Sequence, residues 1–271
     1  MIDVLILTKN EEVHIERCLN NLLKLTNSIY VLDSYSTDKT LQIVEGYTKN
    51  IFFRKFDNYS NQFNWAINEI KFKNEWILRI DADEFLSEEL INELKFNILK
   101  SKKNTYGFYL KRVIHFLGKK IIYGDYFPTY IMRVWRKGYA FCSDDLVDEQ
   151  LILKKGSALK LSNLLIEKND KGLSFWINKH VNYANLESSN YHNYRKKNQI
   201  QISSQLKLKK YKIYYKFPIF LRPFIYFVYR LIIKRGYKDG LKGILFHFLQ
   251  SLLYRFLVDI LIFFKFFRIK K

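Results

Sequence analysis

The first third of the chain alternates between short apolar runs and helix-like segments, and this alternation limits the possible folds more than any other feature. Four apolar runs have the length and β-rich composition of strands: residues 2–8, 28–34, 51–56 and 75–81. The segments between them carry apolar residues at helical spacing. Because parallel strands need a crossover connection, usually a helix, this order predicts an α/β fold with a mostly parallel sheet and helices on both faces.

Beyond residue 101 the pattern becomes richer in strands and then turns helical. We expect strands at 106–121, 128–138 and 157–168, followed by a helix at 172–192. From residue 211 onward, apolar and basic residues recur with helical period. The 271 residues are therefore divided into two predicted parts. Residues 1–205 form the α/β domain, and residues 206–271 form a basic, aromatic helical region.

Polar residues follow three of the predicted strands. They are Thr8 to Glu12, Asp33, and Asp81 to Glu84. In open parallel sheets, ligands bind at the carboxyl ends of the strands. We therefore expect these three groups to meet on one edge of the sheet.

The third group contains Asp81 and Asp83, which are separated by one residue. In an extended chain their side chains project to the same side, where two carboxylates suit Mg²⁺ or Mn²⁺. A divalent ion would cancel their repulsion, and a metal-bound diphosphate is a good leaving group. The alternative is that this acidic stretch caps the helix expected to begin near Ser87.

The positive charge is concentrated near the C-terminal end of the sequence. The formal net charge is +20, and residues 207–271 carry 16 Lys and Arg but only two acids. These basic residues are interleaved with Phe, Tyr, Leu and Ile, as on proteins that bind anionic membranes or nucleic acid. A nucleic-acid-binding protein would not explain the acids at the strand ends, and its basic residues would be spread over a binding face.

The stretch 244–267 is long enough to cross a membrane, but it contains Arg255, Asp259 and Lys265. Charges at the centre of a bilayer are costly, so we expect an amphipathic helix or helical hairpin lying in the membrane interface. A helix packed wholly on the protein and a true span are the alternatives.

Two further features concern the compartment. The two cysteines, Cys18 and Cys142, form neither a disulfide framework nor a zinc-binding pattern, which indicates a reducing compartment. The opening residues MIDVLILTKNEE have no basic region and no cleavage site, so we expect a first strand rather than a signal peptide.

Four short motifs occur in order along the first half: ILTKNEE (6–12), VLDSYSTDKT (31–40), NQFNWAI (61–67) and LRIDADE (78–84). Together they resemble glycosyltransferase family 2, the inverting enzymes of the GT-A fold that use nucleotide sugars. Later segments resemble the bacterial lipopolysaccharide-core β-1,4-glucosyltransferase branch of that family. These segments are YFPTYIMRVWRKG (126–138), DDLVDEQL (144–151), LSFWINKHVNYANLES (173–188) and LRPFIYFVYRLIIKRGYKDGLKGIL (221–245).

The resemblance implies roles for residues of the first three strand ends. Thr8, Asn10 and Glu12 would line a uridine pocket, and Asp33 would accept the uracil N3–H. Asp81 would approach the ribose or the diphosphate and bind the metal ion together with Asp83, the main ligand.

Asp33 and Gln62 each have an alternative role. Asp33 could instead cap the next helix, although Ser36 and Asp38 are better placed to do so. Gln62 would contact the nucleotide or the donor sugar, or belong to an ordinary polar helix face.

Inversion also needs a carboxylate that takes the proton from the acceptor hydroxyl. The resemblance implies that Glu149 is this base. The branch usually has Val-His-Glu here, whereas this chain has Val-Asp-Glu, so Asp148 is the alternative base. A solvated acidic loop is a third possibility. Of the arginines near the strand ends, Arg79, Arg133 or Arg136 would pair with the departing diphosphate, or would lie at the surface.

The expected function is that of an inverting hexosyltransferase assisted by Mg²⁺ or Mn²⁺. It would move a hexose from a UDP-sugar to a lipid-linked acceptor, such as the core of lipopolysaccharide or lipooligosaccharide. The protein would be peripheral on the cytoplasmic face of the bacterial inner membrane, bound to the anionic surface through residues 206–271, with no nucleic-acid partner. The alternatives are a catalytically inactive membrane-associated relative and a basic nucleic-acid-binding protein.

Overall fold

The computed structural model describes residues 1–143, 150–197 and 205–268. Within them the chain forms two compact units. The first contains Met1–His115, Pro128–Ser143 and Gln150–Asp170. The second contains Phe116–Phe127 and the described residues from Lys171 onward.

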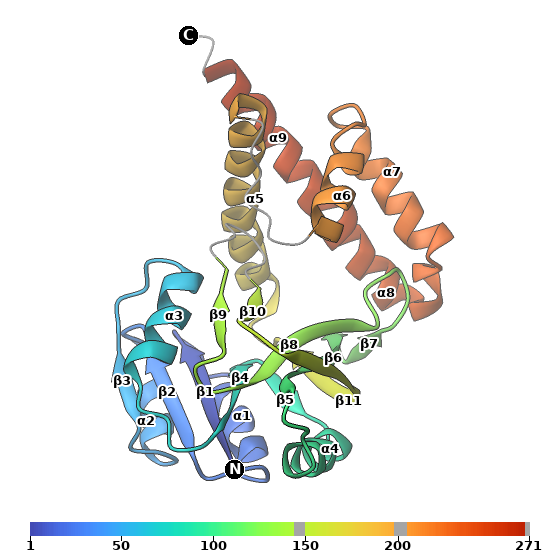
Figure 1. Cartoon of the computed structure of the whole chain (residues 1–271). Helices are drawn as coiled ribbons and strands as arrows, with labels where there is room; N and C mark the ends of the chain where they lie inside the picture. Colours follow the sequence, from blue (N-terminus) through green and yellow to red (C-terminus); the bar gives the residue numbers. More distant parts are fainter. Residues whose placement is uncertain (144–149, 198–204, 269–271) are drawn as a thin grey trace. The chain divides into compact units, whose positions relative to one another are not determined.

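The first unit begins with the predicted alternation of strands and helices (Figure 1). Its strands are β1 (Ile2–Thr8), β2 (Ile29–Asp33), β3 (Ile51–Phe53) and β4 (Trp76–Asp81). The connecting helices are α1 (Ile15–Leu22), α2 (Thr40–Glu45) and α3 (Tyr59–Glu69). The four strands are parallel and lie in the order β3-β2-β1-β4.

The rest of this unit extends the same sheet. Its further elements are β5 (Glu84–Leu86), α4 (Glu88–Leu99), β6 (Thr105–Phe116), β8 (Thr129–Arg136), β9 (Ala140–Cys142), β10 (Leu151–Leu153) and β11 (Ser157–Lys168). Strand β8 joins β4 in antiparallel orientation, and the sheet continues through β6 and β11 to β5. Strands β9 and β10 pair separately.

Both faces of the sheet are covered, as the alternation of side chains along β1 shows. Val4 and Ile6 pack with α1 and α4 in one buried cluster, which also contains Cys18. Leu5 lies in a second buried cluster with Phe63 of α3, on the opposite face. The predicted α/β fold class, a large mostly parallel sheet with helices around it and helices at the C-terminal end, is therefore confirmed.

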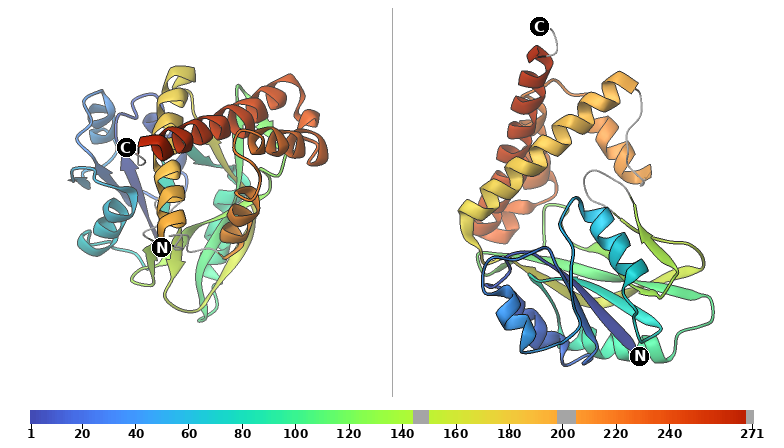
Figure 2. Two further views of the ribbon diagram at one scale, coloured as in Figure 1. Left: turned by 90° about the horizontal axis from the view of Figure 1, so that it is seen from above. Right: turned by 90° about the vertical axis from the view of Figure 1, so that its left-hand side faces the viewer.

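The second unit is mainly helical. It contains β7 (Lys119–Ile121), α5 (Gly172–Lys197), α6 (Gln205–Tyr214), α7 (Arg222–Val228), the π-helical turn η1 (Tyr229–Ile233), the 3₁₀ turn η2 (Gly236–Asp239), α8 (Gly240–His247), the π-helical turn η3 (Phe248–Leu253) and α9 (Tyr254–Arg268). Helices α5 and α9 lie side by side, with Ala184, Val258 and Ile262 buried between them (Figure 2). The buried carboxylate of Asp259 pairs with Arg222.

The compact second unit therefore includes α5, which the predicted division at residue 206 places with the first domain. One continuous helical segment, Gly236–Lys265, is long and apolar enough to cross a membrane, and 28% of its most apolar stretch is buried. The membrane role of residues 206–271 stays a prediction.

Candidate functional site at the carboxyl ends of the strands

The ends of β1 and β2 bring Thr8 and Asp33 together. The two residues are partners in the parallel register, and Thr8 Oγ1 donates a hydrogen bond of 2.8 Å to Asp33 Oδ2. Ser36 donates to Asp33 twice, from its backbone N–H at 2.7 Å and from its hydroxyl at 2.6 Å. A carboxylate offers about four acceptor positions, so one position of Asp33 stays available. Asp33 is fully buried.

Asp38, rather than Asp33, accepts hydrogen bonds from Thr40, the first residue of α2. Asp38 Oδ1 accepts hydrogen bonds from the backbone N–H of Thr40, at 3.0 Å, and from its hydroxyl. Burial opposes the charge on Asp38, but the hydrogen bonds from Thr40 outweigh it and lower the pKa of that carboxyl.

Asn10 and Glu12 join the loop after β1 to the loop after β2. Asn10 Oδ1 accepts from the backbone N–H of Thr37 at 2.8 Å, and Glu12 Oε2 accepts from that of Lys39 at 3.0 Å. Asn10 has a positive φ of 55°, a conformation that asparagine tolerates better than most residues. Both side chains are exposed, so they shape the edge of the sheet and stay accessible to a ligand.

Gln62 points from α3 toward the ends of β2 and β3. Its amide donates to Ser34 Oγ at 3.0 Å and to the carbonyl of Arg54 at 3.2 Å, and its oxygen accepts from Arg54 Nη1 at 2.7 Å. Gln62 is 1% exposed, so it is not part of a solvated polar face. It holds Arg54, which also forms two hydrogen bonds with Asp57, beside the strand ends.

The acidic stretch after β4 is divided between two environments. Asp81 accepts hydrogen bonds from Arg79 at 2.8 and 3.0 Å and from Arg133 at 2.8 Å. Arg133, which is 4% exposed, also donates to the buried Glu84 at 2.5 Å. Asp81 and Glu84 are therefore neutralised by cations of the protein itself.

The surroundings shift the pKa of these groups in opposite directions. Burial would raise the pKa of Asp81, but Arg133 and Arg79 outweigh it and hold that pKa below its usual range. Burial raises the pKa of Glu84 to about 7 against the opposing effect of Arg133. Burial would lower the pKa of Arg133, but Asp81 and Glu84 raise it. The trio is thus held together by charge, with Arg133 and Glu84 buried and Asp81 partly exposed.

Two expectations about this stretch are corrected. The stretch does not cap α4, because Ser87 is the capping residue and its hydroxyl accepts from the N–H of Leu90. The chain is not extended past Asp81 either, since Ala82 and Asp83 form a turn. Alternation along a strand therefore does not set the relative directions of Asp81 and Asp83.

Asp83 lies against the end of β11. Its Oδ2 accepts from the amide of Asn169 at 3.0 Å, and its backbone carbonyl accepts from Lys168 N at 2.8 Å. Asp83 is partly exposed, and within the described residues only Asn169 donates to its carboxylate. Asp83 is therefore oriented but not neutralised, as expected of a metal ligand.

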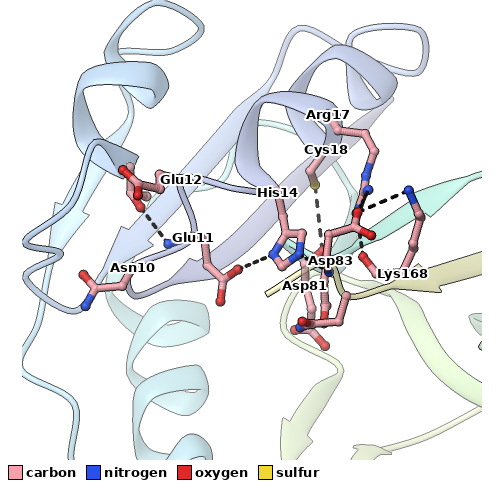
Figure 3. Close-up of polar contacts among 12 residues, drawn as sticks. Asn10, Glu11, Glu12, His14, Arg17, Cys18, Asp81, Asp83 and Lys168 are labelled. Atoms are coloured by element: carbon pink, nitrogen blue, oxygen red, sulfur yellow. Dashed lines mark hydrogen bonds and ion pairs between the residues drawn. The ribbon is translucent and has the colours of Figure 1, made fainter. Parts of the chain in front are cut away.

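The loop that carries Asn169 is fastened to α1 (Figure 3). The backbone N–H of Asp170 donates to His14 Nε2 at 2.8 Å, and Arg17 donates to Asp170 at 2.7 Å and to the carbonyl of Lys168 at 2.6 Å. Because Nε2 accepts, Nδ1 of His14 carries the proton and donates to Glu11 at 2.8 Å. These contacts fix the position of Asn169 and hence of Asp83.

The partly exposed carboxylate of Asp83 is a hard oxygen donor of the kind that Mg²⁺ and Mn²⁺ prefer. Among the described residues, no group of three or more His, Cys, Asp and Glu side chains is placed to hold a metal ion. Both oxygens of Asp81 are engaged by arginines, so Asp83 fits the role of ligand better than Asp81. The predicted bases Glu149 and Asp148 lie outside the described residues.

The arginines differ in direction. Arg79 and Arg133 both turn to Asp81, whereas Arg136 donates to the carbonyl of Thr105 at 2.9 Å, away from the strand ends. The roles of Glu84, Arg54 and Asn169 were not predicted from the sequence. The sequence did contain one indication of these roles, since Glu84 is a charged residue in an otherwise apolar strand. A buried carboxylate of this kind requires a cationic partner.

The residues brought together at this edge match a known family. The family model "Glycosyl transferase family 2" matches residues 3–145, more than half of the chain. The chain belongs to glycosyltransferase family 2. Membership confirms the predicted family.

The curated relatives each match less than half of this chain. An uncharacterized glycosyltransferase of Rickettsia bellii is 38% identical over 105 residues, which are 39% of this chain and 35% of that protein. One from Rickettsia typhi is 33% identical over 118 residues, 43% of this chain and 40% of that protein. The SPbeta prophage-derived glycosyltransferase SunS of Bacillus subtilis is 40% identical over 86 residues, 31% of this chain and 20% of that protein. The chain thus spans two fifths or less of the length of these relatives.

Solved structures similar to this family 2 glycosyltransferase are more distant. Staphylococcus aureus TarS 1–349 in complex with UDP-GlcNAc has a TM-score of 0.44 at 17% identity, covering 69% of this chain and 65% of that one. Glucosyl-3-phosphoglycerate synthase from Mycobacterium tuberculosis, in complex with Mn²⁺ and UDP-glucose, has a TM-score of 0.35 at 17% identity and covers 42% and 44%.

Proposed function

We propose that this protein is an inverting hexosyltransferase that uses a UDP-sugar and a divalent cation, Mg²⁺ or Mn²⁺. The acceptor is a lipid-linked saccharide, such as the core of lipopolysaccharide or lipooligosaccharide, as in the β-1,4-glucosyltransferase branch that the sequence resembles. The protein works as a peripheral protein on the cytoplasmic face of the bacterial inner membrane.

The observation that carries the proposal is the pairing of Thr8 and Asp33 at the ends of adjacent parallel strands, in a family 2 domain. The three hydrogen bonds from Thr8 and Ser36 fix the Asp33 carboxylate and leave one acceptor position. A uracil N3–H is a donor that this position accepts. Asn10 and Glu12 then border the ribose, and the buried Gln62 holds the neighbouring loop in place.

Asp83 holds the divalent cation in this proposal, and Asn169 orients the Asp83 carboxylate. The bound cation supplies positive charge to the departing diphosphate. Asp81 reaches the nucleotide only by exchanging a contact with Arg79 or Arg133, and the released guanidinium is then free to pair with a phosphate. Glu149, or Asp148 in its place, takes the proton from the acceptor hydroxyl.

Release of UDP from a panel of UDP-sugars, with and without Mn²⁺, tests the proposal. Asp83→Asn should abolish metal-dependent UDP release, whereas Glu69→Gln, an exposed carboxylate at the end of α3, should leave it unchanged. A protein that binds no UDP in the presence of Mn²⁺ would not be the enzyme proposed. UDP release that survives in the Asp83→Asn variant would remove Asp83 from the metal site.

A further inference from the structure

One surface of the second unit combines exposed apolar side chains with basic ones. It is formed by the turn and strand at 117–123 and by the helical turns from Ile232 to Leu245, and we call it the tip surface. Its apolar members include Leu241 at 86% exposure, Ile233 at 66%, and Ile232 and Leu117 at 59% each. Side chains of this kind are rarely left so exposed in a group, and such a group marks an interaction site.

Hydrogen bonds join the two parts of the tip surface. The buried carboxylate of Asp239 accepts from the backbone N–H groups of Ile122, at 3.1 and 3.3 Å, and Tyr123, at 2.9 Å. Lys242 donates to the carbonyl of Leu117 at 2.7 Å. Strand β7 and helix α8 lie beside each other within this unit (Figure 1). The exposed apolar residues are therefore held in a fixed arrangement.

The backbone at Leu117 is also unusual. Leu117 and Gly118 have positive φ angles of 50° and 77°, as the two central residues of a tight hairpin turn do. Asparagine, aspartate and glycine are the ordinary residues there, and a bulky side chain is strained. The chain nevertheless places an exposed leucine at the turn, which indicates that the side chain has a use.

The same segments also carry basic residues: Lys119, Lys120, Lys234, Arg235, Lys238 and Lys242. Their one acid is Asp239, which is buried, and Asp125, just beyond residue 123, lies 3.9 Å from Lys234. The surface charge is therefore strongly positive. Exposed aliphatic side chains interleaved with basic ones match a bilayer, in which acyl chains lie beneath phosphate groups.

We propose that the tip surface docks onto an anionic lipid bilayer, with Leu117, Ile233 and Leu241 inserted among the lipids. The inference rests on the proposed membrane location and assigns it to particular residues. Membrane attachment is thereby placed at the turn before β7 and at the start of α8, whereas the sequence led us to expect it from residues 206–271 as a whole. Nucleic acid would leave the aliphatic side chains without a partner.

Sedimentation of the full chain with vesicles tests the proposal, using neutral phosphatidylcholine and mixtures containing phosphatidylglycerol. Leu117→Asn should weaken binding while preserving stability, because asparagine suits the positive φ. The pair Ile233→Ser and Leu241→Ser should lower partitioning at least about tenfold, since burying one leucine is worth about that factor. Lys238→Glu with Lys242→Glu should remove the preference for anionic lipid. The matched control is Leu99→Ser in the first unit, a leucine 69% exposed, which should bind normally.

The outcomes separate this inference from the function on which it rests. A wild-type chain that binds none of the vesicles would refute the proposed membrane location. Vesicle binding that the tip variants and the wild type share equally would refute only the tip surface. Loss of self-association in the tip variants, measured by light scattering, with unchanged vesicle binding would assign the surface to a second copy of the chain instead. UDP release should be unchanged in all tip variants, since none of these residues belongs to the nucleotide site.

Discussion

Replacing Arg133 with methionine should destabilise the protein strongly. Arg133 is 4% exposed and Glu84 is 1% exposed, so the substitution leaves a buried carboxylate without its guanidinium. Breaking a buried ion pair in this way costs about 3–5 kcal/mol. Asp81 keeps its contacts with Arg79 and is partly exposed, so its contribution is smaller. We expect a loss of about 3 kcal/mol in the free energy of unfolding at pH 8.

The loss should depend on pH, with a sign that follows from the pKa of Glu84. Burial already raises that pKa to about 7, and removal of Arg133 raises it further. The folded variant then binds a proton that the unfolded chain, with an ordinary carboxyl pKa, does not bind. The free energy of unfolding of the variant therefore increases as the pH falls from 8 toward 5, and its difference from that of the wild type becomes smaller.

Denaturation by urea at pH 8 and pH 6 provides the measurement. Arg136→Met is the matched control, because Arg136 lies on the same strand but pairs with the exposed Glu75. The double variant Arg133→Met with Glu84→Gln should recover at least about 1 kcal/mol, since it removes the buried charge. An Arg133→Met protein within about 1 kcal/mol of wild type at pH 8 would contradict the buried ion pair.

Three other predictions concern single residues. Asn169→Ala should raise the Mn²⁺ concentration needed for half-maximal UDP release about tenfold or more, because the loss of a residue that orients a metal ligand weakens metal binding. An unchanged metal dependence would show that Asp83 is not a metal ligand oriented by Asn169. Burial lowers the pKa of His247 to about 4, so unfolding at a series of pH values should show about 3 kcal/mol lost as the pH falls from about 6.5 to about 4. This pH dependence should disappear in His247→Gln. Glu149→Ala should keep UDP affinity in calorimetry and lose transfer, and transfer that persists would move the base to Asp148.

The fold was predictable because its first part obeys local rules. Apolar runs of strand length, separated by helical segments, leave few arrangements other than a parallel sheet. The convergence of Thr8 and Asp33 followed from the same reasoning, since parallel neighbours end at the same edge. The cap of α4 was open in the sequence, because Asp83 and Ser87 are both capping residue types, and the hydrogen bond from the N–H of Leu90 to Ser87 decides between them.

The long-range contacts of the site were not predictable in this way. Asn169 lies 86 positions from Asp83 along the chain, and Arg133 lies 49 positions from Glu84. These pairings depend on the register of β11 and β8, which no short stretch of sequence specifies. The tip surface had the same limitation, since contacts of Asp239 and Lys242 bring the turn at 117 next to the helical turns after 232, more than 100 positions away along the chain.

The division of the acids after β4 leads to a last prediction, on metal affinity. Asp81 and Glu84 are already neutralised by Arg79 and Arg133, so among the three described acids directly after β4 a metal ion finds one carboxylate, Asp83, without a cationic partner. One carboxylate binds Mg²⁺ or Mn²⁺ weakly, and phosphate oxygens of the substrate must complete the coordination. Calorimetry should therefore detect weak Mn²⁺ binding to the protein alone and much tighter binding once UDP is present. By linkage, Mn²⁺ must strengthen UDP binding by the same factor. Tight Mn²⁺ binding without nucleotide, retained in Asp83→Asn, would show that the ion is held elsewhere.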